Sequence, residues 1–206
     1  MSFSATDTTV PDVLIPHMSA TLTIGWQAPP RSICDLLQGI PPVAHACSDL
    51  SQIETRCGAR AVGRIASLAG GDQSVTFEMM RQIQGLVLGT DRPGFRKAGA
   101  YTSVRPERYA FFSSLESMFR IKVAADDLDE RHPVIKAVRL YLDIIFFHPF
   151  EDGNARAALL WFTFYCLRYG FGVPDYRRFF GFGFVPGARS CYWEFCSMAI
   201  KEIAKT

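Results

Sequence analysis

The sequence predicts a single all-α domain. Apolar residues recur at intervals of three and four over most of the chain after residue 47, and within this part strand-like alternation is found only around residues 101–104. Strands and helices do not alternate and no internal repeat is found, which argues against a parallel α/β sheet. Because 49% of the 206 residues are hydrophobic, the chain can bury one sizeable core, and disorder throughout and a fibrous structure are excluded.

The first part of the chain differs in composition from the rest. Residues 1–45 are rich in Thr, Ser and Pro, so we expect an extended N-terminal arm with one short strand near Ala20–Ile24. The helical pattern begins after this arm. We therefore expect two parts, an arm over residues 1–45 and a helical domain over residues 46–206.

Two amphipathic helices are expected before residue 90. The first extends over residues 47–69 and is ended by Gly70. The second extends over residues 77–87, with Thr76 as its N-cap and Gly89 as its terminator.

The next segment predicts a loop or short hairpin and then a third helix. Residues 90–107 contain two glycines and two prolines and are expected to form a loop or short hairpin. A helix is expected to open at residues 105–107 and to place Phe112, Leu115 and Phe119 on its apolar face. The acidic run after it, residues 126–130, suits the first turn of a further helix at Pro133.

Two nearly all-apolar helices are expected at the centre of the domain. Val134–Phe147 is apolar except for three residues, spaced three and four apart, which form one polar stripe: Lys136, Arg139 and Asp143. Asn154–Tyr169 forms the second helix and ends at Gly170. Beyond it we expect an irregular aromatic stretch, whose rings favour buried packing over stacking on nucleic acid, and a final helix over residues 190–204.

The connector between the two apolar helices is a polar and charged segment, and we take it as the candidate functional site. It reads HPFEDGNAR, from His148 to Arg156. The N-terminus of the helix that follows offers unpaired N–H groups and a positive dipole end, and Gly153 leaves room for a phosphate to approach. Arg156 can add a charge-assisted contact to phosphate oxygens. The sequence therefore predicts an anion site at this turn.

Two further residues of the connector suit the chemistry of a phosphate compound. Asp152, with Glu151 as competitor, can hold Mg²⁺, which usually takes one or two carboxylates together with substrate oxygens. His148, whose ordinary pKa is about 6.5, can accept a proton from a hydroxyl. Together these groups fit transfer from a nucleoside phosphate to a hydroxyl. The alternative is a capped helix turn with a structural histidine.

The connector resembles the signature of the Fic/Doc family, approximately HPFx(D/E)GN(G/K)R. Seven positions carry the resemblance: His148, Pro149, Phe150, Asp152, Gly153, Asn154 and Arg156. Pro93–Arg96 is similar to the family's segment near its flap, and His132-Pro133 to the start of its central helix. The resemblance extends over about residues 47–200. It implies a Fic-like helical bundle with a small β-hairpin flap, formed here by residues 46–206.

The resemblance implies a nucleotidyltransferase that moves AMP from ATP, its co-substrate, to a Ser, Thr or Tyr hydroxyl of a protein target, with Mg²⁺ as cofactor. His148 would be the general base and Asp152 the metal ligand. The phosphates would be bound by Gly153, Asn154, Ala155 and Arg156. The flap that aligns the target would include Tyr101, Thr102 and Ser103, for which an ordinary hairpin is the alternative.

Three departures from the family pattern leave alternatives open. Position 159 is Leu where adenylylating members commonly carry a second arginine, and its absence is similar to the Doc branch, which transfers the terminal phosphate. Position 155 is Ala, which keeps its backbone N–H. LSQIET, with Glu54, resembles the family's inhibitory helix only in part, and a solvated carboxylate is the alternative. A catalytically idle domain that acts as a binding module is the non-enzymatic alternative.

Charge and hydropathy restrict the partners and the location. The formal net charge is +2, so no global field draws the chain to nucleic acid or to an anionic membrane. The longest charge-free stretch in the second half, Ala157–Leu167, is short of the roughly 20 residues of a membrane span. The N-terminus does not resemble a signal peptide. We expect a cytoplasmic protein, with export as an effector left open.

Overall fold

The structure is a computed structural model, and it describes residues 29–40, 49–101, 108–128, 132–182 and 189–206. In chain order the elements are α2 (Arg31–Gln38), α3 (Ser51–Cys57), α4 (Ala59–Ala69), α5 (Phe77–Leu88), β1 (Ala100–Tyr101), β2 (Arg108–Tyr109), α6 (Leu115–Leu128), α7 (Pro133–Phe147), α8 (Asn154–Arg168), α9 (Arg177–Gly181) and α10 (Arg189–Ile203). The described part of the chain is mostly helical, which confirms the expected fold class.

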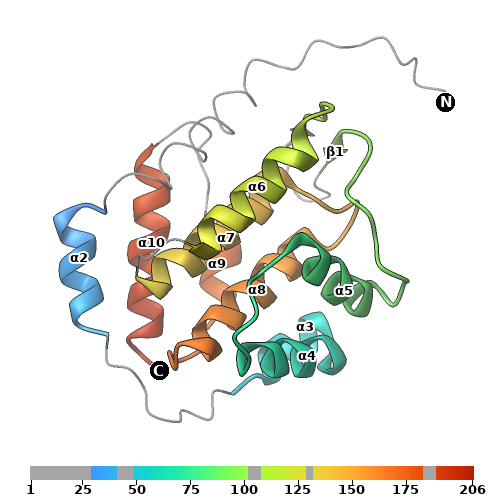
Figure 1. Cartoon of the computed structure of the whole chain (residues 1–206). Helices are drawn as coiled ribbons and strands as arrows, with labels where there is room; N and C mark the ends of the chain where they lie inside the picture. The colour runs from blue at the N-terminus through green and yellow to red at the C-terminus, as the bar shows by residue number, and fades with distance from the viewer. Residues whose placement is uncertain (1–28, 41–48, 102–107, 129–131, 183–188) are drawn as a thin grey trace.

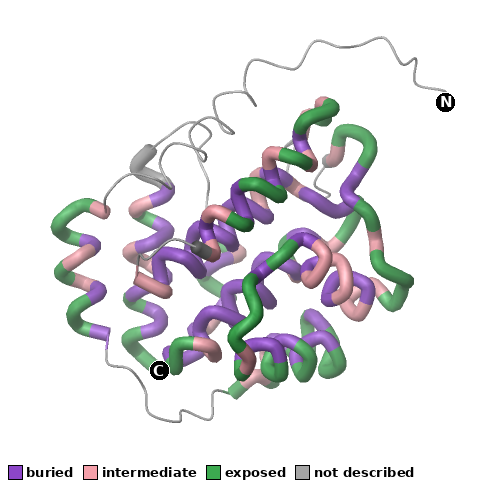
Figure 2. The backbone as a smooth tube through the Cα atoms, in the orientation of Figure 1, coloured by how far each residue is buried: buried purple, intermediate pink, exposed green. Residues whose placement is uncertain are grey.

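Helices α7 and α8 form the centre of the bundle. They pack against each other, α6 and α10 pack on α7, and α3, α4 and α5 pack on α8 (Figure 1). Both central helices are buried along most of their length (Figure 2). Each has 15 residues, and none of the described helices is long and apolar enough to cross a membrane.

The ends of α7 follow from local sequence. Pro133 occupies the first turn, where a missing N–H costs nothing, and the ring of His132 accepts a hydrogen bond from the N–H of Val134 at 3.3 Å. At the other end His148 takes the left-handed conformation, with φ 49° and ψ 58°. The prediction that this helix is central and ends before the connector is confirmed.

The polar stripe of α7 is buried and forms an ion network with α6. Arg139 pairs with Asp126, and the ammonium of Lys122 lies 3.5 Å from Asp126 and 3.1 Å from Asp143. Burial raises the pKa of Asp143 well above its ordinary value, against the opposing effect of Lys122. Two cations and two carboxylates therefore tie α6 to α7 inside the core.

Two expected helices have different bounds. The pattern over residues 47–69 is two helices, because Gly58 adopts φ 87° and separates α3 from α4. The helix expected from residues 105–107 begins only at Leu115, and Arg108 pairs in a strand instead. Asp126 lies inside this helix and not at the start of α7, since it pairs across to the core cations.

Two segments expected to be irregular are helical. α2 lies within the stretch assigned to the extended arm, and its Ile33 and Leu37 are buried on the side that packs against α10. α9 falls in the aromatic stretch, where Tyr176 and Phe179 are buried, so the preference for buried packing is confirmed for these two rings. The strand expected near Ala20–Ile24 lies outside the described residues.

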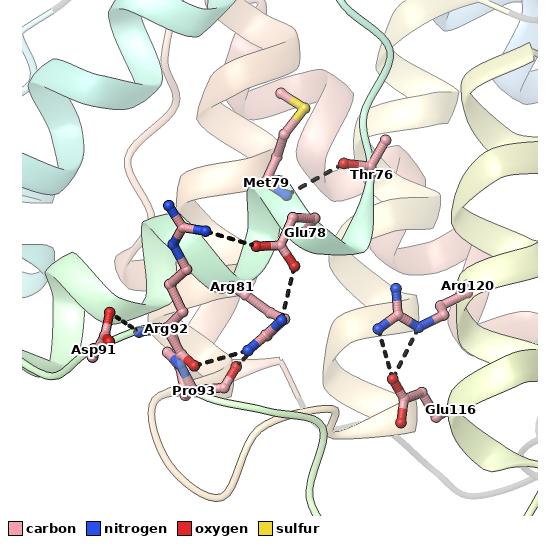
Figure 3. A network of polar contacts seen from close by, with 9 residues as sticks. All are labelled: Thr76, Glu78, Met79, Arg81, Asp91, Arg92, Pro93, Glu116 and Arg120. Atoms are coloured by element: carbon pink, nitrogen blue, oxygen red, sulfur yellow. Dashed lines mark hydrogen bonds and ion pairs between the residues drawn. The ribbon is translucent and has the colours of Figure 1, made fainter.

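A short antiparallel ladder connects α5 to α6. Ala100 pairs with Tyr109 and Tyr101 with Arg108. The segment that leads into it is held by α5, because Arg81 donates to the carbonyls of Pro93 at 2.9 Å and Arg92 at 3.1 Å (Figure 3). Glu78 in turn pairs with both arginines. Thr76 caps α5 by accepting a hydrogen bond from the N–H of Met79, as the sequence predicts.

Candidate active site

The connector from α7 to α8 is closed on itself by the side chain of Asn154. Asn154 accepts a hydrogen bond from the N–H of Phe150 at 2.9 Å and donates its amide to the Phe150 carbonyl at 2.8 Å. Phe150 is fully buried, and its ring stacks on Phe77 with centroids 5.7 Å apart. The amide of Asn154 is thus used within the loop, so the phosphate-binding role expected for this residue rests on its backbone N–H.

The N-terminus of α8 is open to an anion. Gly153 is its N-cap with φ 75°, and no side chain caps the helix. The first N–H groups of an α-helix have no partner within the helix, and the positive end of the helix dipole lies at the same place. The backbones of Asn154 and Ala155 therefore present donors that a phosphate oxygen can accept from.

Asp152 and Arg156 lie at the mouth of this turn. Their side chains form an ion pair at 3.1 Å, with 77% of the aspartate side chain and 34% of the arginine side chain exposed. The other carboxylate oxygen of Asp152 accepts from the N–H of Gly153 at 2.6 Å. Such an exposed pair is worth at most about 1 kcal/mol, so either partner can turn to a ligand at small cost.

Gln84 supports the turn from α5, and sequence reasoning missed it. Its amide donates to the carbonyl of Asp152 at 2.6 Å, and the residue is completely buried. A β-carbon on Gly153 would lie 2.5 Å from the amide nitrogen of Gln84. The signal in the sequence is a polar residue on the apolar face of the helix, four residues after Met80 and next to Ile83.

His148 lies where the connector begins, with its imidazole partly covered. Its Nδ1 is 3.4 Å from the carbonyl of Ile145, and the ring of Tyr109 stacks on it with centroids 4.0 Å apart and an interplanar angle of 18°. Burial, opposed by the Ile145 carbonyl, lowers the pKa of His148 to about 4. The imidazole is therefore neutral at pH 7, and if Nδ1 carries the proton, Nε2 is free to accept one.

Arg96 is the second residue that sequence reasoning did not assign to the site. It is 3% exposed, and its guanidinium donates to the carbonyl of His148 at 2.7 Å. Its backbone N–H donates to the carbonyl of Pro149 at 2.8 Å. The segment Pro93–Arg96 resembles the family's segment near its flap, but this resemblance gives Arg96 no role, and its partners are backbone carbonyls that no residue type marks.

Several expected site residues are not brought to the loop. Thr102 and Ser103 lie outside the described residues, as does the side chain of Tyr101. Leu159 is completely buried, so its side chain lies in the core and away from any phosphate. Glu54 is exposed and pairs with none of the described cations. Its helix does approach the loop, because the thiol of Cys57 lies 3.7 Å from the carbonyl of Arg156.

The residues present suit a metal that arrives with a nucleotide. In the described part of the chain no group of three His, Cys, Asp or Glu side chains could hold a metal ion. Mg²⁺ commonly needs only one or two protein carboxylates when phosphate oxygens and waters complete its shell. Asp152, exposed beside an open helix N-terminus, meets this requirement, and Glu151 is exposed next to it.

One part of the chain matches a known family. Residues 74–166, which include the connector, match the model of the Fic/DOC family. No curated protein matches the chain.

Solved structures of Fic proteins share the fold. IbpAFic2 covalently tethered to Cdc42 superposes with a TM-score of 0.66 at 18% identity, over 92% of this chain and 75% of that chain. IbpAFic2 alone gives a TM-score of 0.65 at 16% identity, over 91% and 74%. A Fic domain containing signaling protein from Bacteroides thetaiotaomicron gives 0.51 at 20% identity, over 93% and 87%. At these identities the likeness shows the fold alone.

Proposed function

We propose that this chain is a Mg²⁺-dependent transferase that moves AMP from ATP to a hydroxyl side chain of a protein target. The observation that carries the proposal is the juxtaposition of a neutral imidazole, the uncapped N-terminus of α8 and an exposed carboxylate–arginine pair within His148–Arg156. The match of residues 74–166 to the Fic/DOC family model supports a transferase. Transfer to a protein is supported by IbpAFic2, whose structure is tethered to the protein Cdc42.

In the proposed reaction the target hydroxyl oxygen attacks the α-phosphorus of ATP. The new oxygen–phosphorus bond replaces the bond to the β-phosphate, so pyrophosphate leaves, and His148 accepts the hydroxyl proton. The N–H groups at the start of α8 and the guanidinium of Arg156 hold phosphate oxygens. Asp152 would hold Mg²⁺, which neutralises phosphate charge when bound. ATP as co-substrate favours a cytoplasmic place of action.

Transfer of the terminal phosphate is the second candidate, and Leu159 favours it. The position is completely buried and apolar, so it cannot supply the arginine that adenylylating members commonly place at the terminal phosphate. In this proposal the N-terminus of α8, Arg156 and the Mg²⁺ that Asp152 would hold then set the pose of ATP. If the nucleotide binds in the reverse direction, the γ-phosphorus becomes the atom attacked and ADP the leaving group.

ATP labelled at either phosphate separates the two reactions. We expect label from α-labelled ATP in a protein band, either the chain itself or a protein of an added cell lysate, and no label from γ-labelled ATP. Label from the γ position alone would overturn AMP transfer in favour of phosphorylation. Intact mass of the labelled protein identifies the added group.

Two histidine variants give the experiment a matched control. His148→Ala is expected to lower turnover by roughly 10² to 10⁴, whereas His132→Ala, which alters the N-cap at the opposite end of α7, should lower stability and leave transfer intact. Full loss of transfer in both variants would show only that α7 must be intact. A wild-type chain that labels nothing, with a cellular effect that survives His148→Ala, supports the binding module.

A further inference from the structure

Arg96 connects two segments that are far apart in sequence. Its guanidinium donates to three carbonyls at the base of the β-ladder, those of Ala98 at 2.5 Å, Ala110 at 2.6 Å and Tyr109 at 3.5 Å. It also donates to the last carbonyls of α7, those of His148 at 2.7 Å and Phe147 at 3.3 Å. One side chain therefore holds both the β-ladder and the residue that begins the connector.

The charge of Arg96 is satisfied by backbone oxygens. None of the described carboxylates pairs with it, and burial lowers its pKa to about 10, so it stays protonated at neutral pH. A buried cation without a counter-ion is costly unless its donors are all used. The carbonyls at the end of α7 carry the negative end of the helix dipole, which partly compensates the charge.

The residue that Arg96 holds on the α7 side has an unfavourable backbone conformation. Among the described residues His148 is the single non-glycine residue with positive φ, a state that costs an L-residue roughly 1–2 kcal/mol. The Arg96 guanidinium binds the carbonyl of His148, and the Arg96 N–H binds the carbonyl of Pro149. These two bonds hold the peptide groups before and after Pro149 and so oppose relaxation of His148.

The residue that Arg96 holds on the ladder side covers the imidazole. Tyr109, whose carbonyl accepts from Arg96 at 3.5 Å, is the same residue whose ring stacks on His148 at 4.0 Å. The guanidinium is itself presented from a fixed place. Phe95 is buried against Phe77, and Arg81 binds the carbonyls of Arg92 and Pro93, three and two residues before Phe95 (Figure 3).

We propose that Arg96 is a positioning residue that fixes the imidazole of His148 beneath Tyr109, and that it thereby ties the place of the proposed base to the place of the β-ladder. Only the effect of Arg96 on catalysis rests on the proposed function. The positioning itself is a property of the folded chain, and it can be measured without any substrate.

The first test follows the ring protons of His148 by NMR, with His148→Ala to assign them. A ring stacked at 4.0 Å shifts these protons upfield, and we expect Arg96→Gln to move them toward free-histidine values. Arg96→Lys should give a smaller change, since one ammonium can keep the bond to the His148 carbonyl. Tyr109→Ala, which removes the stack but not Arg96, provides the reference for complete loss.

Arg168→Gln is the matched control. Arg168 also donates to two backbone carbonyls, of Gly71 at 2.7 Å and Gln73 at 2.8 Å, and its guanidinium lies over Phe164. It lies at the far end of α8 from the connector. We expect Arg168→Gln to lower the melting temperature and to leave the His148 signals in place. His148 signals that do not move in Arg96→Gln or in Arg96→Lys would overturn the proposal.

The second test separates positioning from binding. If the chain transfers AMP, Arg96→Gln should lower kcat on the order of 10²-fold with the KM for ATP unchanged, because the anion site at α8 is untouched. Arg168→Gln should keep kcat. A rise in KM at unchanged kcat would contradict a positioning role. A wild-type chain without transfer would end the proposed function, while the NMR result would still decide the place of Arg96.

Discussion

The amide of Gln84 lies so close to Gly153 that a side chain on residue 153 would have to displace it. A β-carbon there would lie 2.5 Å from the amide nitrogen of Gln84 and 3.2 Å from the guanidinium of Arg156. Gly153 also has φ 75°, so the position demands glycine for two independent reasons. The turn at the start of α8 is thus shaped by α5 as well as by its own sequence.

Gly153→Ala is expected to destabilise the protein by more than its backbone conformation explains. The matched control is Gly89→Ala, which also has positive φ but has no atom within 4 Å of an added β-carbon. The control should cost about 1–2 kcal/mol in urea unfolding, and Gly153→Ala should cost more. The double variant Gln84→Ala/Gly153→Ala should recover part of that excess. Equal losses for the two glycines would contradict the contact.

Stability should fall as the pH drops through the range in which His148 resists protonation. The pKa of His148 is lowered from 6.5 to about 4 in the folded protein, so between these values the unfolded chain binds the proton and the folded chain does not. The unfolding free energy therefore rises with pH across this window. We expect the loss between pH 6.5 and pH 4 to be smaller in His148→Gln, measured by urea unfolding. An unchanged pH profile in that variant would contradict a buried neutral imidazole.

Mg²⁺ should bind well only together with a nucleotide. Asp152 is one exposed carboxylate, which leaves most of the octahedral shell to waters and phosphate oxygens. Calorimetry is expected to show weak uptake of Mg²⁺ alone and clear uptake in the presence of a non-hydrolysable ATP analogue. Asp152→Asn should abolish that difference, and Glu151→Gln should keep it. Loss of the difference in Glu151→Gln but not in Asp152→Asn would assign the metal to Glu151.

Removal of Glu54 should leave any transfer activity unchanged. The carboxylate is exposed and pairs with none of the described cations, while Leu159 offers it no partner because that position is apolar and buried. The test compares the transfer rates of wild type and Glu54→Ala at saturating ATP. An increase in rate would show that Glu54 restrains the site, as the resemblance of LSQIET to an inhibitory helix suggests.

Loss of one buried cation should destabilise the core strongly. Lys122 lies between Asp126 and Asp143, all three nearly fully buried, so Lys122→Met leaves two carboxylates with less compensation. We expect a loss of about 3–5 kcal/mol. Arg120→Met, two residues away and paired with Glu116 at the surface, should cost at most about 1 kcal/mol. Similar losses would show that the network contributes no more than a surface pair.

Periodicity predicted the helices better than their ends. The apolar pattern continues across Gly58 because α3 and α4 both pack on α8. The break between the two helices, where Gly58 has φ 87°, is therefore not visible in the pattern. The acidic run was placed at the start of α7 by the helix-dipole argument. The structure places Asp126 in α6 instead, since a partner on α7, Arg139, outweighs that local preference.

The residues of the candidate site that belong to a motif could be predicted from the sequence. The residues that support the site by binding backbone carbonyls could not. The motif gave the residues that carry charge at the connector, from His148 to Arg156. Gln84 and Arg96 bind carbonyl oxygens, which every residue possesses, and no pattern of residue types marks such a bond. Placement of supporting residues therefore required the structure.

The residues between α7 and α8 begin with His148 and end with Gly153. Both are left-handed, and each lies at the end of a central helix. The imidazole and the N-terminus of α8 thus lie at the ends of two helices that share one continuous core. Sliding of α7 along α8 would break the contacts of that core, so the imidazole and the N-terminus of α8 keep a fixed position relative to each other.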